Sequence, residues 1–235
     1  MSDLEDRQLE EVDLVLVNDE FEEESEHIIR ETALKIMVNG KPFATAMMLA
    51  GMEAEYAIGF LYSSGYISKM ADVLQINVDG DTVDIKLAGE ITATERGPVV
   101  SDLVIDHEDI VTGVRAVSTS QLFQKTHATH AAGLFQGGKP AAAIGEDIER
   151  HQALEKVIGA GLLAGTDFSR TTAVSTGRQP TGMIKRCRNA GIPIIATNGV
   201  PTTKSVALAE ESGIAIIGMT GEEDLLIYTH PERIR

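Results

Sequence analysis

Cysteine, tryptophan and long apolar runs are all scarce in this sequence of 235 residues. It has one cysteine, Cys187, no tryptophan, and only 4% aromatic residues. A single cysteine excludes an intramolecular disulfide and any metal site built from several cysteines, and it is typical of a reducing compartment. No apolar run reaches membrane-spanning length, and the acidic start MSDLEDRQLEE is unlike a signal peptide. We therefore expect a cytoplasmic protein without a membrane segment.

Positive charge is also scarce. There are 20 lysines and arginines against 36 acids, a net charge of −16, and 13 of the acids fall within the first 31 residues. A nucleic-acid partner would need a basic face, so we expect none. We assign residues 1–30 as an acidic segment with a frayed tail over 1–11, a strand over 12–17 and a solvated loop over 19–26. Whether this segment binds a partner or only keeps the chain soluble stays open.

The next part of the sequence, residues 31–105, predicts a small α+β lobe. Asn39-Gly40 favours the positive φ values of a type I′ turn, and Asp79-Gly80-Asp81 also separates two alternating runs. The expected elements are strands over 32–38, 43–49, 73–78 and 83–87 and a helix over 53–62. Residues 89–106 have no clear period, which places the lobe boundary there.

Residues 106–235 instead alternate between strand and helix patterns. We expect strands over 140–144, 171–174, 192–196, 214–219 and 225–229 and helices over 146–162, 181–190 and 203–212, with 107–125 ambiguous. Such alternation predicts an α/β fold with a largely parallel sheet and right-handed crossovers. Ligands of such sheets bind at the rim formed by the loops that follow the strands.

Several loops expected at this rim could bind an anion. Two of them precede helix N-termini, and Arg178 and Lys204 add charges suited to phosphate. These facts predict a nucleotide or another phosphorylated cofactor. The alternative is that Thr, Gly and Asn in these loops only cap helices and form turns.

The predicted helix over 146–162 contains a carboxylate and an imidazole four residues apart, Asp147 and His151. On a helix this spacing puts both on one face, where the carboxylate would fix the tautomer of the imidazole. A purely structural pair is an equal alternative. Because Glu146 and Asp147 would complement the helix dipole, we expect no phosphate at this helix N-terminus.

Six segments of the larger lobe occur in the order found in a known family. They are THAAGLF at Thr129, GEDIERHQALEKVIG at Gly145, STGR at Ser175, AGIPI at Ala190, VPTT at Val200 and IYTHPERI at Ile227. Together with RETALKIMVNGKPFATAMMLAGMEAEYAIGFLYSSGYI in the small lobe, they make the chain from Glu31 onward resemble the formate dehydrogenase accessory sulfurtransferase family, FdhD.

This resemblance implies a cytidine-deaminase-like, three-layer α/β/α domain over 106–235, a homodimer, and a role in maturing a molybdenum or tungsten formate dehydrogenase. It also implies a cysteine desulfurase as sulfur donor and the bis-molybdopterin guanine dinucleotide as client cofactor, with no intrinsic metal. The cofactor-binding residues that it implies are His130, Glu146, Asp147, Arg150, His151, Arg178, Pro201, Thr202, Met219, Thr220, Gly221, Glu222, Glu223, Asp224, Tyr228 and His230. Asp147 would orient His151, and Tyr228 and His230 would close one side of the site.

The sequence departs from the family pattern where chemistry is concerned. The C-G-x-C sulfur-carrier loop of the family corresponds to TATERGPVVSDL at 92–103, which has no cysteine. Persulfide chemistry requires a thiolate, and Cys187 is predicted to be an inert residue in the middle of a helix. Glu149 replaces a family glycine, and the acidic run at 221–224 would repel phosphate. Sulfur transfer is therefore expected to be lost or supplied by another protein.

Two other function classes stay open. One is a deaminase-like hydrolase on the same fold, although the P-C-x-x-C element of zinc deaminases is missing. A zinc site made only of His127, His130 and His151 is conceivable within this class. The other is a non-catalytic scaffold that binds a protein partner through its acidic N-terminal face.

Overall fold

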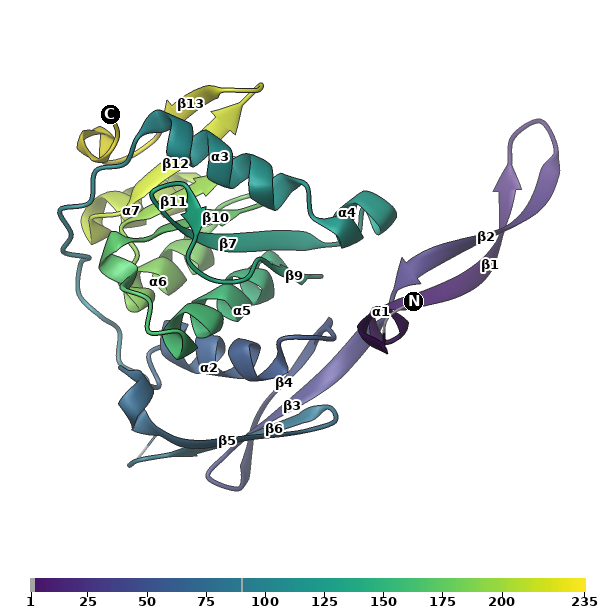
Figure 1. The fold of residues 1–235 in the computed structure, drawn as a ribbon, viewed down its shortest axis with the longest axis horizontal. Helices are drawn as coiled ribbons and strands as arrows, with labels where there is room; N and C mark the ends of the chain where they lie inside the picture. The colour runs from purple at the N-terminus through teal and green to yellow at the C-terminus, as the bar shows by residue number, and fades with distance from the viewer. Residues whose placement is uncertain (1–2, 90) are drawn as a thin grey trace.

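The structure is a computed structural model that describes residues 3–89 and 91–235. Figure 1 shows a small sheet and a large sheet with helices between them, and a long two-stranded arm that leaves one side of the molecule. No helix within the described ranges is long and apolar enough to cross a membrane.

The arm is an antiparallel hairpin. It consists of β1 (Leu9–Val17) and β2 (Phe21–Ile29), preceded by α1 (Asp3–Gln8). The predicted strand over 12–17 is confirmed as part of β1, but regular structure over 3–11 replaces the predicted tail. The predicted acidic loop over 19–26 is wrong from Phe21 onward. Its glutamates can join a strand because they lie opposite aliphatic residues, as Glu24 lies opposite Leu14, rather than opposite one another.

The small sheet confirms both predicted hairpins. Its strands lie in the order β4 (Lys41–Leu49), β3 (Glu31–Val38), β6 (Thr82–Leu87) and β5 (Val73–Asp79), and α2 (Glu53–Ser63) and the short η1 (Met70–Asp72) also belong to this part of the chain. Asn39 and Gly40 have φ values of 52° and 71°, as the predicted type I′ turn requires. Residues 91–104 have no regular secondary structure, in agreement with the sequence pattern.

The large sheet is mixed rather than largely parallel. Its order is β13 (Asp224–Ile227), β12 (Ala215–Thr220), β11 (Ile194–Thr197), β10 (Thr172–Ser175), β7 (His130–Gln136) and β8 (Lys139–Pro140), with β9 (Gly145–Asp147) also paired to β7. Only β10, β11 and β12 are mutually parallel. β8 and β9 both run antiparallel to β7, and β10, which the chain enters after α5, also runs antiparallel to β7. The tight turn after β12 makes β13 antiparallel as well.

Helices cover both faces of the large sheet. They are α3 (His107–Ser118), α4 (Gln121–Thr126), α5 (Arg150–Leu163), α6 (Thr181–Ala190) and α7 (Thr203–Ser212), with short turns η2 (Phe168–Arg170) and η3 (Pro231–Arg233). α3 packs on one face through a cluster that includes Ile110 and Val114. α5, α6 and α7 cover the other face, and their hydrophobic cluster continues through α2 into the small sheet (Figure 1).

Two predicted boundaries near α5 are wrong. Residues 140–144 form no continuous strand, and the helix begins at Arg150 instead of Glu146. Glu146 and Asp147 are instead paired with Ala131 and His130 of β7. This pairing with a distant strand takes the two acids out of the helix.

The helices α2 and α5 touch at their backbones. A Cβ added at Gly59 would lie 1.8 Å from the Glu155 carbonyl oxygen, and one added at Gly159 would lie 1.8 Å from the Glu55 carbonyl oxygen. Only glycine permits so close a crossing. The small and large sheets are therefore joined by a continuous, tightly packed core.

Candidate functional site

The loops that follow β10 and β11 are hydrogen-bonded to each other. The Thr197 hydroxyl donates to the Gly177 carbonyl at 2.6 Å, and the Gly177 amide donates to Asn198 Oδ1 at 3.1 Å. A Cβ at Gly199 would lie 2.3 Å from the Gly177 carbonyl oxygen, so this contact requires glycine. The two loops thus form one edge of the large sheet, which we call the rim.

His130, the first residue of β7, packs against the rim. Its Nδ1 lies 3.2 Å from the Thr176 hydroxyl, which also accepts the Ala131 amide at 3.0 Å. A Cβ at Gly177 would lie 2.8 Å from the ring. Burial, together with the Arg150 and Arg178 charges, lowers the pKa of His130. His130 is therefore a neutral imidazole at pH 7.

Arg150 and His151 occupy the first turn of α5 beside His130. Burial lowers the pKa of His151 to about 4, and the positive charges of Arg186 and Arg150 act in the same direction. The positive charge of Arg150 lowers the pKa of both imidazoles, and His151 packs against the start of α6, where a Cβ added at Gly182 would lie 2.8 Å from its Nε2. We call His130, Arg150, His151 and Arg178 the rim cluster. It combines two neutral imidazoles, which can donate or accept hydrogen bonds, with two guanidinium groups.

The N-terminus of α5 opens into the rim cluster. Within the described residues, the N-cap residue Glu149 makes no side-chain capping bond, and the buried Arg150 Nε has no hydrogen-bond partner. A helix N-terminus with free amides and an adjacent guanidinium favours an anion. The expectation that Glu146 and Asp147 complement this helix dipole is wrong, because both acids precede the helix on β9. Glu146 and Asp147 therefore give no reason to exclude phosphate here, and the one acid at this terminus is the N-cap residue Glu149, whose charge acts on His130.

Asp147 forms an ion pair with Lys156, a residue of the same family motif, GEDIERHQALEKVIG at Gly145. Lys156 Nζ lies 2.8 Å from Asp147 Oδ2, and these side chains are 2% and 0% exposed. The same ammonium donates to the carbonyls of Leu49 and Glu146 at 2.8 and 2.9 Å. Because Asp147 lies on β9, the predicted i, i+4 helical pairing with His151 is wrong. Asp147 joins β9, β4 and α5 as part of a buried polar contact.

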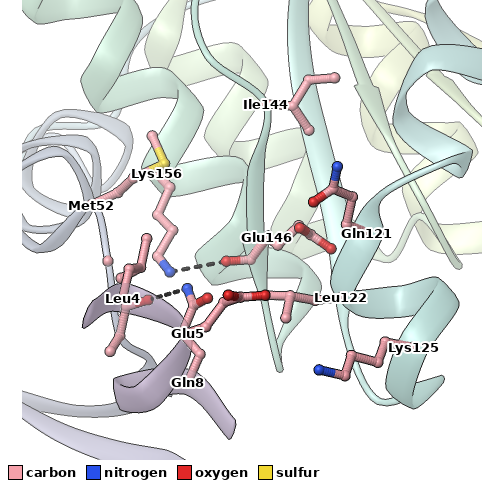
Figure 2. Close-up of a pocket in the computed structure, with 12 residues that line it drawn as sticks. Leu4, Glu5, Gln8, Met52, Gln121, Leu122, Lys125, Ile144, Glu146 and Lys156 are labelled. Carbon is pink, nitrogen blue, oxygen red and sulfur yellow. Dashed lines mark hydrogen bonds between the residues drawn. The ribbon is translucent and has the colours of Figure 1, made fainter. Parts of the chain in front are cut away.

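The Glu146 side chain points into a cleft beside the rim cluster. Figure 2 shows Glu146 opposite Lys156, with α1 and α4 forming the walls. The cleft has a volume of about 610 Å³. Its lining residues are Leu4, Glu5, Gln8, Ala50, Gly51, Met52, Gln121, Leu122, Lys125, Ile144, Glu146 and Lys156. Its mixed polar and apolar lining differs in character from the rim cluster.

Three further candidate residues lie near the rim. Pro201 forms a bridge with Gln179, next to Arg178. Thr202 caps α7, where its hydroxyl accepts the Ser205 amide at 3.3 Å. The Tyr228 ring approaches Gly218 at the end of β12, where an added Cβ would lie 3.1 Å from the ring. Thr202 therefore already has a structural role in helix capping.

The remaining candidates lie away from the rim cluster. The turn that contains Met219, Thr220, Gly221, Glu222, Glu223 and Asp224 leans towards α3 on the opposite face of the sheet. Arg115 of α3 lies 3.1 Å from Glu223 Oε1, and the His107 ring donates to the Glu223 carbonyl at 2.7 Å. His230 contacts the Glu210 carbonyl at 3.1 Å, at the end of α7 that is distal to the rim. The structure does not place His230 beside Tyr228 as a side of the rim site.

Two further sequence-based possibilities were a metal site made of histidines and a reactive thiol at Cys187. Among residues 3–89 and 91–235, no group of three or more His, Cys, Asp or Glu side chains could hold a metal ion, and this covers the trio of His127, His130 and His151. Cys187 is buried in α6, and burial raises its pKa to about 12. A buried thiol with this pKa is unreactive, as the sequence predicted.

Comparison with known sequences identifies the family. The model of the FdhD/NarQ family matches residues 29–99 and 88–235. The chain belongs to the FdhD/NarQ family. Among its FdhD relatives is the "Sulfur carrier protein FdhD" of Methanothermobacter thermautotrophicus, which is 29% identical over 244 residues, covering 95% of this chain and 98% of the relative.

Other members of the FdhD/NarQ family match over a similar length. The protein of the same name from Sulfolobus acidocaldarius is 29% identical over 250 residues, covering 97% of this chain and 99% of the relative. A crystal structure of a formate dehydrogenase accessory protein from Desulfotalea psychrophila has 27% identity and a TM-score of 0.86, covering 97% of this chain and 100% of that one. The FdhD fold therefore extends over nearly the whole chain.

The sequence reasoning missed three residues that shape the rim cluster of this FdhD family member. Thr176 contacts His130, Arg186 faces His151, and Glu155 holds Arg186 through an ion pair of 2.7 Å. Glu155 and Arg186 are 31 residues apart in the sequence, on α5 and α6. Glu155 on α5 and Arg186 on α6 are charged residues on otherwise apolar helix faces, and this pattern could have indicated that they are paired.

Proposed function

We propose that this protein is an accessory factor for the maturation of a formate dehydrogenase and that it binds the phosphates of a guanine-dinucleotide cofactor at the rim cluster. One observation carries the proposal: the uncapped N-terminus of α5 opens beside Arg150 and Arg178. Family membership supports the choice of client. The client cofactor would be bis-molybdopterin guanine dinucleotide.

The rim cluster is chemically suited to such a ligand. Arg150 and Arg178 can each form paired hydrogen bonds with phosphate oxygens, and the free amides of α5 add further donors. The neutral imidazoles of His130 and His151 can bind polar groups without adding charge. By contrast, the acidic turn around Glu222 and Glu223 repels phosphate, so we assign that turn no phosphate contact.

We propose that this chain binds the cofactor but does not itself transfer sulfur. Several relatives are named sulfur carrier proteins, but residues 92–103 contain no cysteine. Hydrogen bonds hold this segment in place, for example from Arg96 to the Ser68 carbonyl at 2.7 Å. Cys187 is buried and cannot form a reactive thiolate at neutral pH. Sulfur would have to come from another protein, such as a cysteine desulfurase.

The wider expectations from the resemblance belong to the same proposal. They are the cytidine-deaminase-like layering of residues 106–235, a homodimer, a formate dehydrogenase as partner, and a cytoplasmic location. The boundaries 1–30, 31–105 and 106–235 stay predictions.

Binding of GDP measured by titration calorimetry tests the rim cluster. Arg150→Ala and Arg178→Ala should each weaken binding about tenfold or more, since a charge-assisted hydrogen bond contributes roughly 1.5–3 kcal/mol. Arg170→Ala is the matched control, because this exposed arginine lies in η2, at the opposite edge of the sheet. If wild type and all three variants bind GDP equally or not at all, the proposed cofactor site is wrong.

A gene deletion tests the client. Loss of the gene should abolish formate oxidation, and both the wild-type gene and Cys187→Ser should restore it. If restoration also succeeds when His130 and Arg178 are both replaced by Ala, a non-catalytic scaffold becomes the better explanation.

A further inference from the structure

Glu155 and Arg186 form an ion pair between two helices whose buried faces are otherwise mostly apolar. The helices are α5 and α6, which cover the same face of the large sheet (Figure 1). The side chains of Glu155 and Arg186 are 2% and 23% exposed, and Arg186 Nε donates to Glu155 Oε1 at 2.7 Å. Burial of a carboxylate costs free energy, and apolar residues of similar volume in place of a buried ion pair are often at least as stable. The pair therefore requires an explanation other than stability.

The ion pair fixes the guanidinium of Arg186 in place. Its Nε is bonded to Glu155, and its Nη1 donates to the Gly182 carbonyl at 3.1 Å, one turn earlier on α6. Hydrogen bonds on two different nitrogens define both the position and the plane of this rigid group. Within the part of the chain that the structure describes, Nη2 has no hydrogen-bond partner. Arg186 therefore presents a charged donor at a fixed position.

Arg186 and His151 border the same space at the start of α6. A Cβ added at Gly182 would lie 2.8 Å from His151 Nε2 and 3.4 Å from Arg186 Nη1. The positive charge of Arg186 also lowers the pKa of His151. Because position 182 is a glycine, no side chain fills the space that the imidazole and the guanidinium both border.

The positive charges of the site are distributed over both imidazoles. Arg178 acts on His130, Arg186 acts on His151, and Arg150 acts on both. A ligand with two linked phosphate groups can meet more of these guanidinium groups than a single phosphate can. The pyrophosphate of a dinucleotide is such a ligand group.

We propose that Arg186 is a third phosphate-binding guanidinium beside the rim cluster, that Glu155 positions it, and that the site therefore prefers a nucleoside diphosphate to a monophosphate. This inference rests on the cofactor site proposed above and adds to it a ligand class and two residues. Glu155 touches no ligand and acts only through Arg186. Since a guanidinium that is already held in place loses less conformational entropy on binding, Glu155 strengthens the contact.

Replacing Glu155 separates this positioning role from simple electrostatics. Glu155→Leu removes a negative charge from the neighbourhood of an anion site, so charge alone predicts tighter binding of GDP. Leucine also accepts no hydrogen bond and leaves Arg186 unrestrained, so the loss of positioning predicts weaker binding. The two explanations therefore predict changes in opposite directions.

Calorimetric titration of the full-length protein with GDP and GMP tests the proposal. Arg186→Met should weaken GDP binding at least about tenfold, because a charge-assisted hydrogen bond is lost, and should weaken GMP binding less. Glu155→Leu should weaken GDP binding about threefold or more, because the free arginine must be ordered on binding. The double variant Glu155→Leu/Arg186→Met should bind GDP as Arg186→Met does, since Glu155 acts only through Arg186.

Lys185→Met is the matched control for the loss of one positive charge from α6. Its exposed ammonium lies 3.6 Å from Glu95 Oε1, and the variant should bind GDP like the wild-type protein. Unchanged or tighter GDP binding by Glu155→Leu would overturn the positioning role. Equal weakening by Lys185→Met and Arg186→Met would overturn the assignment of Arg186 as a contact.

Arg150→Ala in the same titrations separates this inference from the cofactor site on which it rests. If Arg150→Ala weakens GDP binding while Arg186→Met binds like wild type, this inference is wrong and the cofactor site stands. A wild-type protein that binds no GDP would overturn both. If Arg186→Met does not fold, because Glu155 is left buried without its partner, the double variant decides. It removes both charges together, and its binding of GDP with wild-type affinity would overturn the inference.

Discussion

The buried contact between Asp147 and Lys156 makes a prediction that separates structural from ligand-binding roles. Replacing Asp147 by Asn keeps an oxygen that can accept the Ile148 amide, which lies 2.8 Å from the carboxylate, but it removes the charge opposite the ammonium. Because both side chains are almost fully buried, the uncompensated ammonium should cost about 3–5 kcal/mol of folding free energy. Asp147→Ala should cost more, since it also leaves the amides of Leu49 and Ile148 without their acceptor.

Thermal unfolding measures this loss. For a chain of this size, 1 kcal/mol corresponds to about 2–4 °C in Tm, so Asp147→Asn should lower Tm by roughly 6–20 °C. The remaining folded protein should bind GDP with unchanged affinity, because Asp147 contacts Lys156 and not His151. Exposed Asp102→Asn serves as the control and should leave Tm within about 1 °C. An Asp147→Asn variant with wild-type Tm and weakened GDP binding would refute the structural role and support the orienting role.

Three further predictions concern other parts of the core. The pKa of His151 is lowered to about 4 in the folded protein, so the unfolded chain binds more protons between about pH 4 and 6.5, and stability should fall as the pH drops through this window. His151→Gln should flatten the fall of Tm with pH, and an unchanged profile of Tm against pH would contradict the prediction. Gly159→Ala would place a Cβ 1.8 Å from the Glu55 carbonyl oxygen and should cost at least about 1–3 kcal/mol in urea unfolding, whereas Gly97→Ala, which meets open space, should be nearly neutral. Cys187 should react with Ellman's reagent only after unfolding, and rapid reaction of the native protein would disprove its burial.

Turn residues and hydrophobic periodicity correctly predicted the hairpins of the small sheet and two helices of the large lobe, since both depend on residues close together in the sequence. Asn39-Gly40 fixed the first hairpin of the small sheet, and the helices α6 and α7 were predicted over their observed ranges. The start of α5 could not be predicted this way. Residues 145–147 favour neither state strongly, and their pairing with β7 decides between strand and helix. The same limit applies to β2, whose glutamates look like a loop until β1 is placed beside them.

The candidate site shows the same division. Motif resemblance singled out His130, Arg150, His151 and Arg178, and the fold brings these side chains together. The partner of Asp147 was assigned wrongly, because a helical spacing rule was applied to a residue on a strand. Thr176 and Arg186 reach the cluster from other elements, and no spacing within one segment could have revealed them.

The glycine crossing of α2 and α5 has a mechanical consequence. Because the backbones of α2 and α5 are in direct contact, no layer of side chains lies between them, and the small and large sheets cannot shift relative to each other at this point. Excised halves would each present a bare helix flank to water, so we expect neither to fold alone. A displacement of the first turn of α5 should therefore also displace α2 and the small sheet that packs against it.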